Sequence, residues 1–156
     1  MESRVLGPIE LVGGLGGGVF ETTTELGGVI VPFRLEVDFP GRFDERHLAQ
    51  LDAILSGWDR IELMARQALE SALKDPGSAP SVLFREWVDE SGSRDDDTRG
   101  FLAVLKPERV TMLWDAPGAH QDRIVMPYRY SPSADAVVLR FRERVGVEID
   151  PVRRAA

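Results

Sequence analysis

The strongest hydrophobic pattern in the chain lies between residues 43 and 77 and predicts two amphipathic helices. In each half of this stretch, apolar residues recur every three or four positions, which places them on one face of a helix. The first face comprises Leu48, Leu51, Leu55 and Trp58, and the second comprises Ile61, Met64, Ala65, Ala68, Leu69, Ala72 and Leu73. Each helix therefore has one face to bury against the rest of the protein.

Local signals set the ends of these helices. The carboxylate of Asp44 can accept hydrogen bonds from the free amides of the first turn, and Phe43 before it can pack on Leu48. The sequence DPG at residues 75–77 ends the second helix, because proline lacks an amide hydrogen and disfavours helical geometry in the residue before it. One continuous helix would be about 45 Å long. We therefore expect the chain to turn back at residues 56–57, a Ser-Gly pair, and to form an αα-hairpin.

Residues 29–39 alternate between apolar and polar side chains and predict a long strand with one buried face. The apolar face comprises Val29, Val31, Phe33, Leu35, Val37 and Phe39, and the polar face comprises Arg34, Glu36 and Asp38. Pro32 has no amide donor, which favours an edge strand or a bulge at that point. The helices that follow are the natural cover for the apolar face.

Residues 8–25 predict a β-hairpin, because short apolar runs and threonines flank the glycine-rich sequence GGLGGG. This glycine run lacks the Lys-Ser/Thr pair of a phosphate-binding loop, and it leads into a strand instead of a helix. We interpret it as a turn.

The second half of the chain predicts two more helices and the rest of the sheet. Residues 79–91 have the apolar spacing of a helix, and a short helix follows from Asp97 or Thr98 to Leu105. Alternating patterns then predict antiparallel strands at residues 109–114, 124–130 and 137–142, with a last short piece at 147–149.

Together these elements predict an α+β fold. We expect a mostly antiparallel sheet formed by N- and C-terminal strands, covered on one face by the central αα-hairpin and one or two further short helices. The length of 156 residues suits a single domain over residues 1–156, in which residues 1–7 and 151–156 are expected to fray.

The charged alternating strand VPFRLEVDF, followed by FDERHLAQLDAIL and WDRIELMARQALESAL, resembles a bacterial family of small α+β domains that carry no assigned activity. The resemblance extends over about residues 29–145 and rests on pattern, without a catalytic motif. Similar small acidic domains occur as immunity proteins in bacterial toxin systems. The resemblance thus implies a bacterial protein and transfers no functional residue.

Composition argues against several classes of function. No apolar run approaches the roughly 20 residues that cross a bilayer, and no secretory leader is visible, so we expect a cytoplasmic protein without membrane association. The absence of cysteine removes disulfide and thiol chemistry. The net charge of −7 argues against nucleic-acid binding. The small basic row of Arg140, Arg142 and Arg144 is interpreted as a solvated strand face.

Residues that carry catalysis in other proteins occur here without a recognisable motif. The two histidines, His47 and His120, stand near a predicted helix start and in a predicted turn. Trp58, Trp87 and Trp114 lie on apolar stripes, which favours core packing, and Trp114 at a strand end is the best placed of the three to line a ligand pocket. We predict no catalytic residue, no cofactor and no metal ligand.

The densest acidic cluster comprises Asp89, Glu90, Asp95, Asp96 and Asp97. It lacks the alternating oxygens, the glycine turn and the final Glu of a calcium loop. Clustered negative charge steers the approach of positively charged partners. The sequence therefore predicts a non-enzymatic domain that binds a basic protein through these acids, as an immunity or regulatory protein would. The alternative is a small-molecule-binding protein or a hydrolytic enzyme whose site lies between sheet and helices.

Overall fold

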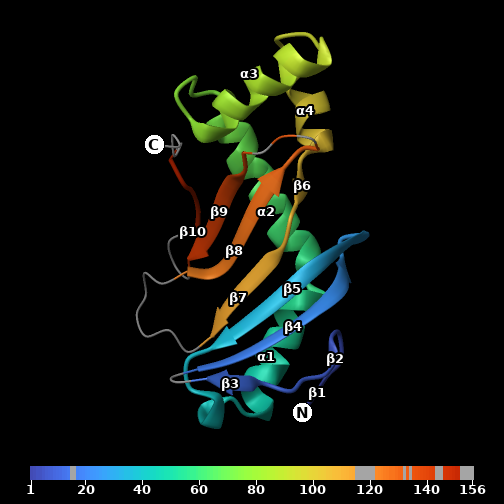
Figure 1. The fold of residues 1–156 in the computed structure, drawn as a ribbon, viewed down its shortest axis with the longest axis vertical. Helices are drawn as coiled ribbons and strands as arrows, with labels where there is room; N and C mark the ends of the chain where they lie inside the picture. The colour runs from blue at the N-terminus through green and yellow to red at the C-terminus, as the bar shows by residue number, and fades with distance from the viewer. Residues whose placement is uncertain (15–16, 115–121, 132, 134, 143–145, 152–156) are drawn as a thin grey trace.

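The two ends of the chain build one sheet, and the middle of the chain builds the helices that cover it (Figure 1). The computed structural model describes residues 1–14, 17–114, 122–131, 133, 135–142 and 146–151. In this part of the chain the fold is α+β, as the sequence predicts. The strands of the main sheet are β3 (Val12–Gly14), β4 (Gly17–Leu26), β5 (Val29–Val37), β6 (Lys106–Pro107), β7 (Val110–Trp114), β8 (Asp122–Arg129), β9 (Val137–Arg142) and β10 (Gly146–Ile149).

The sheet runs in the order β10-β9-β8-β7-β5-β4-β3, and the short strand β6 pairs with β8. The predicted N-terminal hairpin is β3 and β4, which pair antiparallel, and the three predicted C-terminal strands are β7, β8 and β9, in which β8 pairs antiparallel with both β7 and β9. β5 and β7 are parallel, with Phe33 opposite Val110. The helices lie between these two strands in sequence, and such a long crossover is what a parallel pair requires. The sheet is therefore mostly antiparallel, with one parallel pair at its centre.

The strand β5 follows the predicted parity up to Val37, but Phe39, which was predicted on the buried face, lies beyond the strand and is 49% exposed. Phe33 and Leu35 are buried, whereas Arg34 and Glu36 on the other face are partly exposed. β5 lies between β4 and β7, so the edge-strand interpretation of Pro32 is wrong. The proline is accommodated because the parallel ladder with β7 begins one residue later, at Phe33. Its missing amide hydrogen therefore costs no bond in that ladder.

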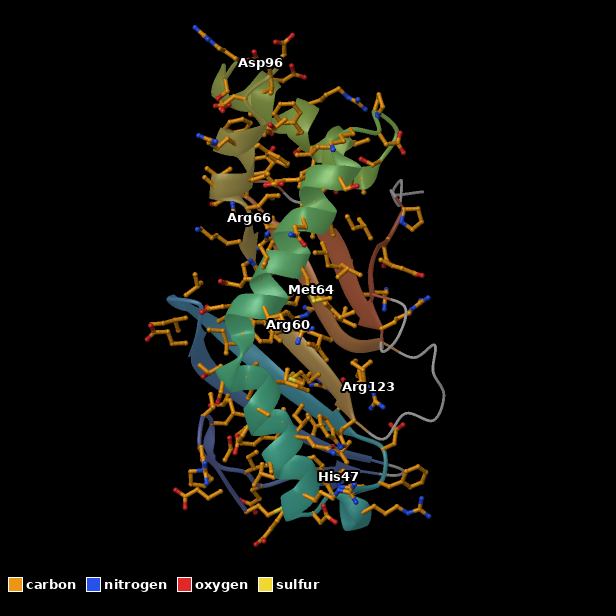
Figure 2. The ribbon with its side chains drawn as sticks, turned by 180° about the vertical axis from the view of Figure 1, so that it is seen from behind. His47, Arg60, Met64, Arg66, Asp96 and Arg123 are labelled. Carbon is orange, nitrogen blue, oxygen red and sulfur yellow. The ribbon has the colours of Figure 1, made fainter. Side chains whose placement is uncertain are left out.

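The first two helices are α1 (Glu45–Ser56) and α2 (Trp58–Ala72), and Gly57 alone separates them. The predicted break is present, since Gly57 has φ −96° and ψ 28°, outside helical geometry. The predicted αα-hairpin is absent, because the two helices continue end to end along the long axis of the molecule (Figures 1 and 2). Seven strands side by side span about 30 Å at about 4.8 Å each. A long helical pair therefore has a surface to lie on without turning back.

Two further helices, α3 (Ala79–Ser91) and α4 (Thr98–Val104), stack at the far end of α2 (Figure 1). Their bounds agree with the prediction. Ser78 accepts a hydrogen bond from the amide of Ser81 at the start of α3, and Gly92 ends the helix with φ 69°. This left-handed conformation is one that glycine adopts without steric cost.

The core fills the space between the helices and one face of the sheet. Leu51 of α1, Leu35 of β5, Leu139 of β9 and Phe101 of α4 are each 0% exposed. The opposite face of the sheet lies in front of α1 and α2 in Figure 1, and no helix of the described chain covers it. On that face Arg34 forms ion pairs with Glu21 and Glu36. The prediction that helices cover one face is confirmed.

The N-terminus forms a second, two-stranded ladder, β1 (Glu2–Ser3) with β2 (Gly7–Pro8). The hydroxyl of Ser3 donates to Asp52 of α1, and the amide of Arg4 donates to the same carboxylate at 3.0 Å. Ser3 is buried. Residues 2–8 are therefore tied to α1 instead of fraying, because a carboxylate on the helix satisfies their donors. The predicted fraying at the C-terminus concerns residues 151–156, of which residues 152–156 lie outside the described residues.

None of the described helices combines the length and the apolar character that a bilayer crossing requires.

Candidate functional site

The predicted acidic cluster lies at one end of the molecule, where α3 ends and α4 begins; Asp96 marks the place in Figure 2. Its five acids differ in whether their side chains make hydrogen bonds within the protein. Glu90 and Asp97 make hydrogen bonds that shape this end of the protein. Asp89, Asp95 and Asp96 are exposed, and their side chains make no hydrogen bond or ion pair within the described chain.

Glu90 is held by Tyr130, which follows β8 in the chain. The Tyr130 hydroxyl donates to Oε2 of Glu90 at 3.0 Å, and Tyr130 itself is 3% exposed. Burial, together with this hydrogen bond and the charges of Glu86 and Glu90, raises the pKa of Tyr130 above its ordinary value. Glu86 lies one turn before Glu90 in α3, and its Oε1 accepts a hydrogen bond from the hydroxyl of Ser133 at 3.2 Å. These two bonds tie α3 to the connection between β8 and β9.

An aromatic cluster lies beneath the acidic end. Phe101 of α4 packs against Phe84 and Trp87 of α3, with ring centroids 5.3 and 5.7 Å apart, and against Tyr130 at 6.4 Å. Aromatic rings at these separations attract one another beyond the area they bury. The two helices that carry the acids are therefore fixed to each other and to the sheet, and Trp87 serves packing.

Asp97 has a local structural task. Its carboxylate accepts a hydrogen bond from the amide of Gly100 at 2.9 Å and caps the N-terminus of α4. The same segment also carries Arg94 and Arg99, both exposed. Three acids therefore remain as unbonded surface charge, Asp89 at the end of α3 and Asp95 and Asp96 in the loop, with two arginines nearby.

The histidine and tryptophan residues considered from the sequence serve helix capping and core packing where the structure describes them. Asp44 accepts from the amide of His47 at 3.0 Å, and His47 Nδ1 accepts from the amide of Asp44 at 3.3 Å, so His47 completes a capping box. The bond from the His47 amide holds the pKa of Asp44 below its ordinary value. Trp114 is 7% exposed and packs edge-on against Phe43 at 5.9 Å, and Trp58 is 5% exposed. His120 lies outside the described residues.

The basic row on β9 is engaged by acids of β10 and its end. Arg140 makes a bidentate pair with Asp150, with Nε to Oδ1 at 2.7 Å and Nη2 to Oδ2 at 3.0 Å. Arg142 Nη1 lies 2.8 Å from Glu148. Arg144 lies outside the described residues. Arg140 and Arg142 are only partly exposed and each is paired with an acid, so this row forms ion pairs along the sheet and is not the freely solvated face that the sequence suggested.

A cleft between α2 and the sheet is a second candidate site, and its residues were not singled out from the sequence. It has a volume of about 410 Å³ and is bounded by α2, the turn between β4 and β5, the end of α4, β6 and β8. Polar groups reach it from three of these elements: Asp59, Glu62 and Arg66 from α2, Lys106 from β6 and Tyr128 from β8. Apolar side chains line much of the remainder, including Leu69, Leu102 and Leu105.

Two of these polar groups are withdrawn from water. Tyr128 is 8% exposed, and burial followed by the charge of Glu62 raises its pKa to about 12. Glu62 is half-buried, and burial followed by the charge of Asp59 raises its pKa. Its carboxylate lies against the α-carbon of Gly27, where a Cβ would overlap it. The fold thus holds a carboxyl group and a phenol in one semi-enclosed space.

Among the described residues, no group of three or more His, Asp or Glu side chains is placed to hold a metal ion. Comparison of the chain with models of protein families, with curated proteins and with solved structures finds no match. The resemblance to the bacterial α+β family therefore stays a prediction.

Proposed function

We propose that this chain is a non-enzymatic protein-binding domain whose acidic end recognises a basic partner, as an immunity or regulatory protein would. The observation that carries the proposal is that Asp89, Asp95 and Asp96 are exposed and unbonded on a base that is itself fixed. Charges held in place at a surface steer an oppositely charged protein and lose little entropy when they meet it. The resemblance of the sequence and its lack of cysteine favour a bacterial cytoplasmic setting.

The division of the acids into bonded and unbonded ones supports a surface built for charge. Glu90 and Asp97 keep the ends of α3 and α4 in place, so the three remaining carboxylates are displayed from a defined geometry. Arg94 and Arg99 reduce the local net charge but make no ion pair with these acids within the described chain. A partner that offers several lysines or arginines would complement the three free carboxylates.

The proposal is tested by capture from a lysate of the source organism at about 50 mM salt, where surface charges are weakly screened. Three immobilised proteins are compared: the wild type, a variant with Asp89→Asn, Asp95→Asn and Asp96→Asn, and a control with Glu10→Gln, Glu25→Gln and Asp38→Asn. The control removes three exposed acids elsewhere, so the change in net charge is the same.

We expect a basic protein to be retained by the wild type and by the control and to be lost from the first variant. Asp97 and Glu90 stay unchanged, so the melting temperatures of all three proteins should agree closely. The same set of proteins on all three columns would contradict the proposal, and so would a retained set without a basic member.

A second candidate function, the binding of a small molecule between sheet and helices, is favoured by the buried hydroxyl of Tyr128 in the cleft.

A further inference from the structure

We propose that the cleft between α2 and the sheet binds a small zwitterion with an apolar body, of the chemical class of an aliphatic amino acid. This site is separate from the acidic end and does not depend on the function proposed for it.

The first observation is an unsatisfied hydroxyl. Tyr128 is more than nine-tenths buried and lines the cleft, yet within the described chain no group makes a hydrogen bond with its hydroxyl. Buried polar groups in proteins nearly always have a partner, because leaving one unpaired costs free energy. The backbone of Tyr128 is fixed on both sides, opposite Pro107 of β6 and Val137 of β9. The side chain of Tyr128 therefore lines the cleft from a fixed backbone, and its hydroxyl keeps its hydrogen-bonding capacity for an occupant.

The second observation is the balance of charges around the same space. Asp59 and Glu62 bring two carboxylates, and Arg66 and Lys106 bring two cations. Figure 2 shows Arg66 on the side of α2 that faces α4 and β6. No ion pair links these four groups to one another in the described structure. Asp59, Arg66 and Lys106 are exposed at the rim of the cleft, and Glu62 is half-buried. An occupant with one ammonium and one carboxylate group would pair with both signs, whereas a singly charged molecule would pair with only one.

The third observation is the lining between the charges. Leu69, Leu102 and Leu105 are buried and form much of the floor. The volume of about 410 Å³ lies in the usual range for a small-molecule site. An aliphatic side chain would bury its surface on these leucines while the charged groups remain at the polar rim. Polar rim and apolar floor together match an amino acid with an aliphatic side chain.

The turn between β4 and β5 lies against the Glu62 carboxylate. Gly27 has φ 60° and the carboxylate of Glu62 occupies the space where a side chain at that position would begin. The carboxylate therefore lies beside this turn at the edge of the cleft, where an ammonium group could pair with it. This arrangement holds the anionic half of the site without a protein cation bonded to it.

The test is isothermal titration of the full-length protein with L-leucine, L-valine, L-methionine and L-phenylalanine as probes. 3-Methylbutylamine and 4-methylpentanoate serve as analogues of leucine that lack the carboxylate or the ammonium group. We expect at least one amino acid to bind with a dissociation constant below about 10 mM, and each analogue to bind at least about tenfold more weakly. No detectable heat from any of the four amino acids, or an analogue that binds as tightly as leucine, would overturn the proposal.

Variants show whether binding occurs in this cleft. Tyr128→Phe keeps the packed ring and removes only the hydroxyl, and Glu62→Gln and Arg66→Gln each remove one charge. Each of these variants should bind the amino acid about tenfold or more weakly than the wild type does. Glu70→Gln and Arg60→Gln are matched controls on exposed positions of α2 outside the cleft and should leave the affinity unchanged. Equal affinities for Tyr128→Phe and the wild type, with circular dichroism spectra that agree, would contradict the site.

Discussion

The two tyrosines of the chain are both buried, but their hydroxyls differ in hydrogen bonding. Tyr130 donates to Glu90 and thereby fastens α3 to the sheet, so its hydroxyl has a structural task. Tyr128, two residues earlier, lines a cleft, and its hydroxyl has no such partner in the described chain. The contrast separates a side chain that holds the fold together from one that is available to an occupant.

Both tyrosines should resist ionisation in the folded protein. Burial raises the pKa of Tyr128 to about 12 and shifts that of Tyr130 in the same direction, whereas in the unfolded chain a tyrosine ionises at about pH 10. Because the pKa of Tyr128 is higher in the folded state than in the unfolded state, the neutral hydroxyl's contribution to stability is complete below about pH 10. This contribution is lost as the pH rises through about 12.

The near-ultraviolet absorbance of tyrosinate measures this ionisation directly, because the chain has only these two tyrosines. We expect the signal to appear near pH 10 in denaturant. In native buffer we expect it at least about one pH unit later, together with unfolding. Tyrosinate that forms near pH 10 while the circular dichroism stays native would show that the hydroxyls are open to solvent.

Leu51 of α1 is 0% exposed and faces the sheet. Replacing Leu51 with Ala should lower the free energy of unfolding by about 2 to 5 kcal/mol, because the change removes apolar contacts and leaves a cavity. Leu63→Ala on α2 is the matched control, since Leu63 is 56% exposed and should cost well under about 1 kcal/mol. Urea denaturation curves of the two variants check the difference, and equal midpoints would mean that the face of α1 is misplaced.

At the scale of the element, the turn between β4 and β5 couples a sheet to a helix. Gly27 and Gly28 both have positive φ, at 60° and 78°, so each favours glycine for the same reason. They differ in surroundings: a Cβ at residue 27 would overlap the Glu62 carboxylate of α2, whereas one at residue 28 meets open space. The hairpin turn therefore packs against α2 through one glycine only.

Gly28→Ala should cost about 1 to 2 kcal/mol, which is the cost of a left-handed conformation for a residue with a Cβ. Gly27→Ala should cost clearly more, because Glu62 must also move. In a Glu62→Ala background the two glycine substitutions should cost the same, since the overlap is gone. Thermal or urea unfolding of the two glycine variants, of Glu62→Ala and of the two double variants measures this, and an equal cost in the wild-type background would show that Glu62 does not contact the turn.

Helix and strand positions were predictable because their causes are local. Asp44, the DPG at 75–77 and the capping residues of α3 and α4 act within one turn, and alternation in β5 follows from strand geometry. The direction of the chain after Gly57 was not predictable in this way. Its small departure from helical geometry permits either course, and the extended sheet beneath decides in favour of two helices end to end.

At the scale of the whole molecule, the acidic end and the cleft lie on different parts of an elongated fold. The acids were visible in the sequence as a dense charge run, but their roles were not. Glu90 is bonded to Tyr130, 40 positions away, and only the packing of α3 on the sheet creates that bond. The cleft draws residues from separate segments, α2, the β4–β5 turn, α4, β6 and β8, so no local pattern identifies it.

The central claim is that the free carboxylates of Asp89, Asp95 and Asp96 steer a basic partner. Its most direct test is the association rate constant of the partner captured by the wild type, measured by surface plasmon resonance at about 50 and 300 mM salt. The account predicts a fast, strongly salt-dependent association for the wild type and for the Glu10→Gln, Glu25→Gln and Asp38→Asn control. It predicts a rate lower by at least about tenfold, with little salt dependence, for the variant that lacks the three acids. Equal association rates for that variant and the wild type at low salt would contradict the account.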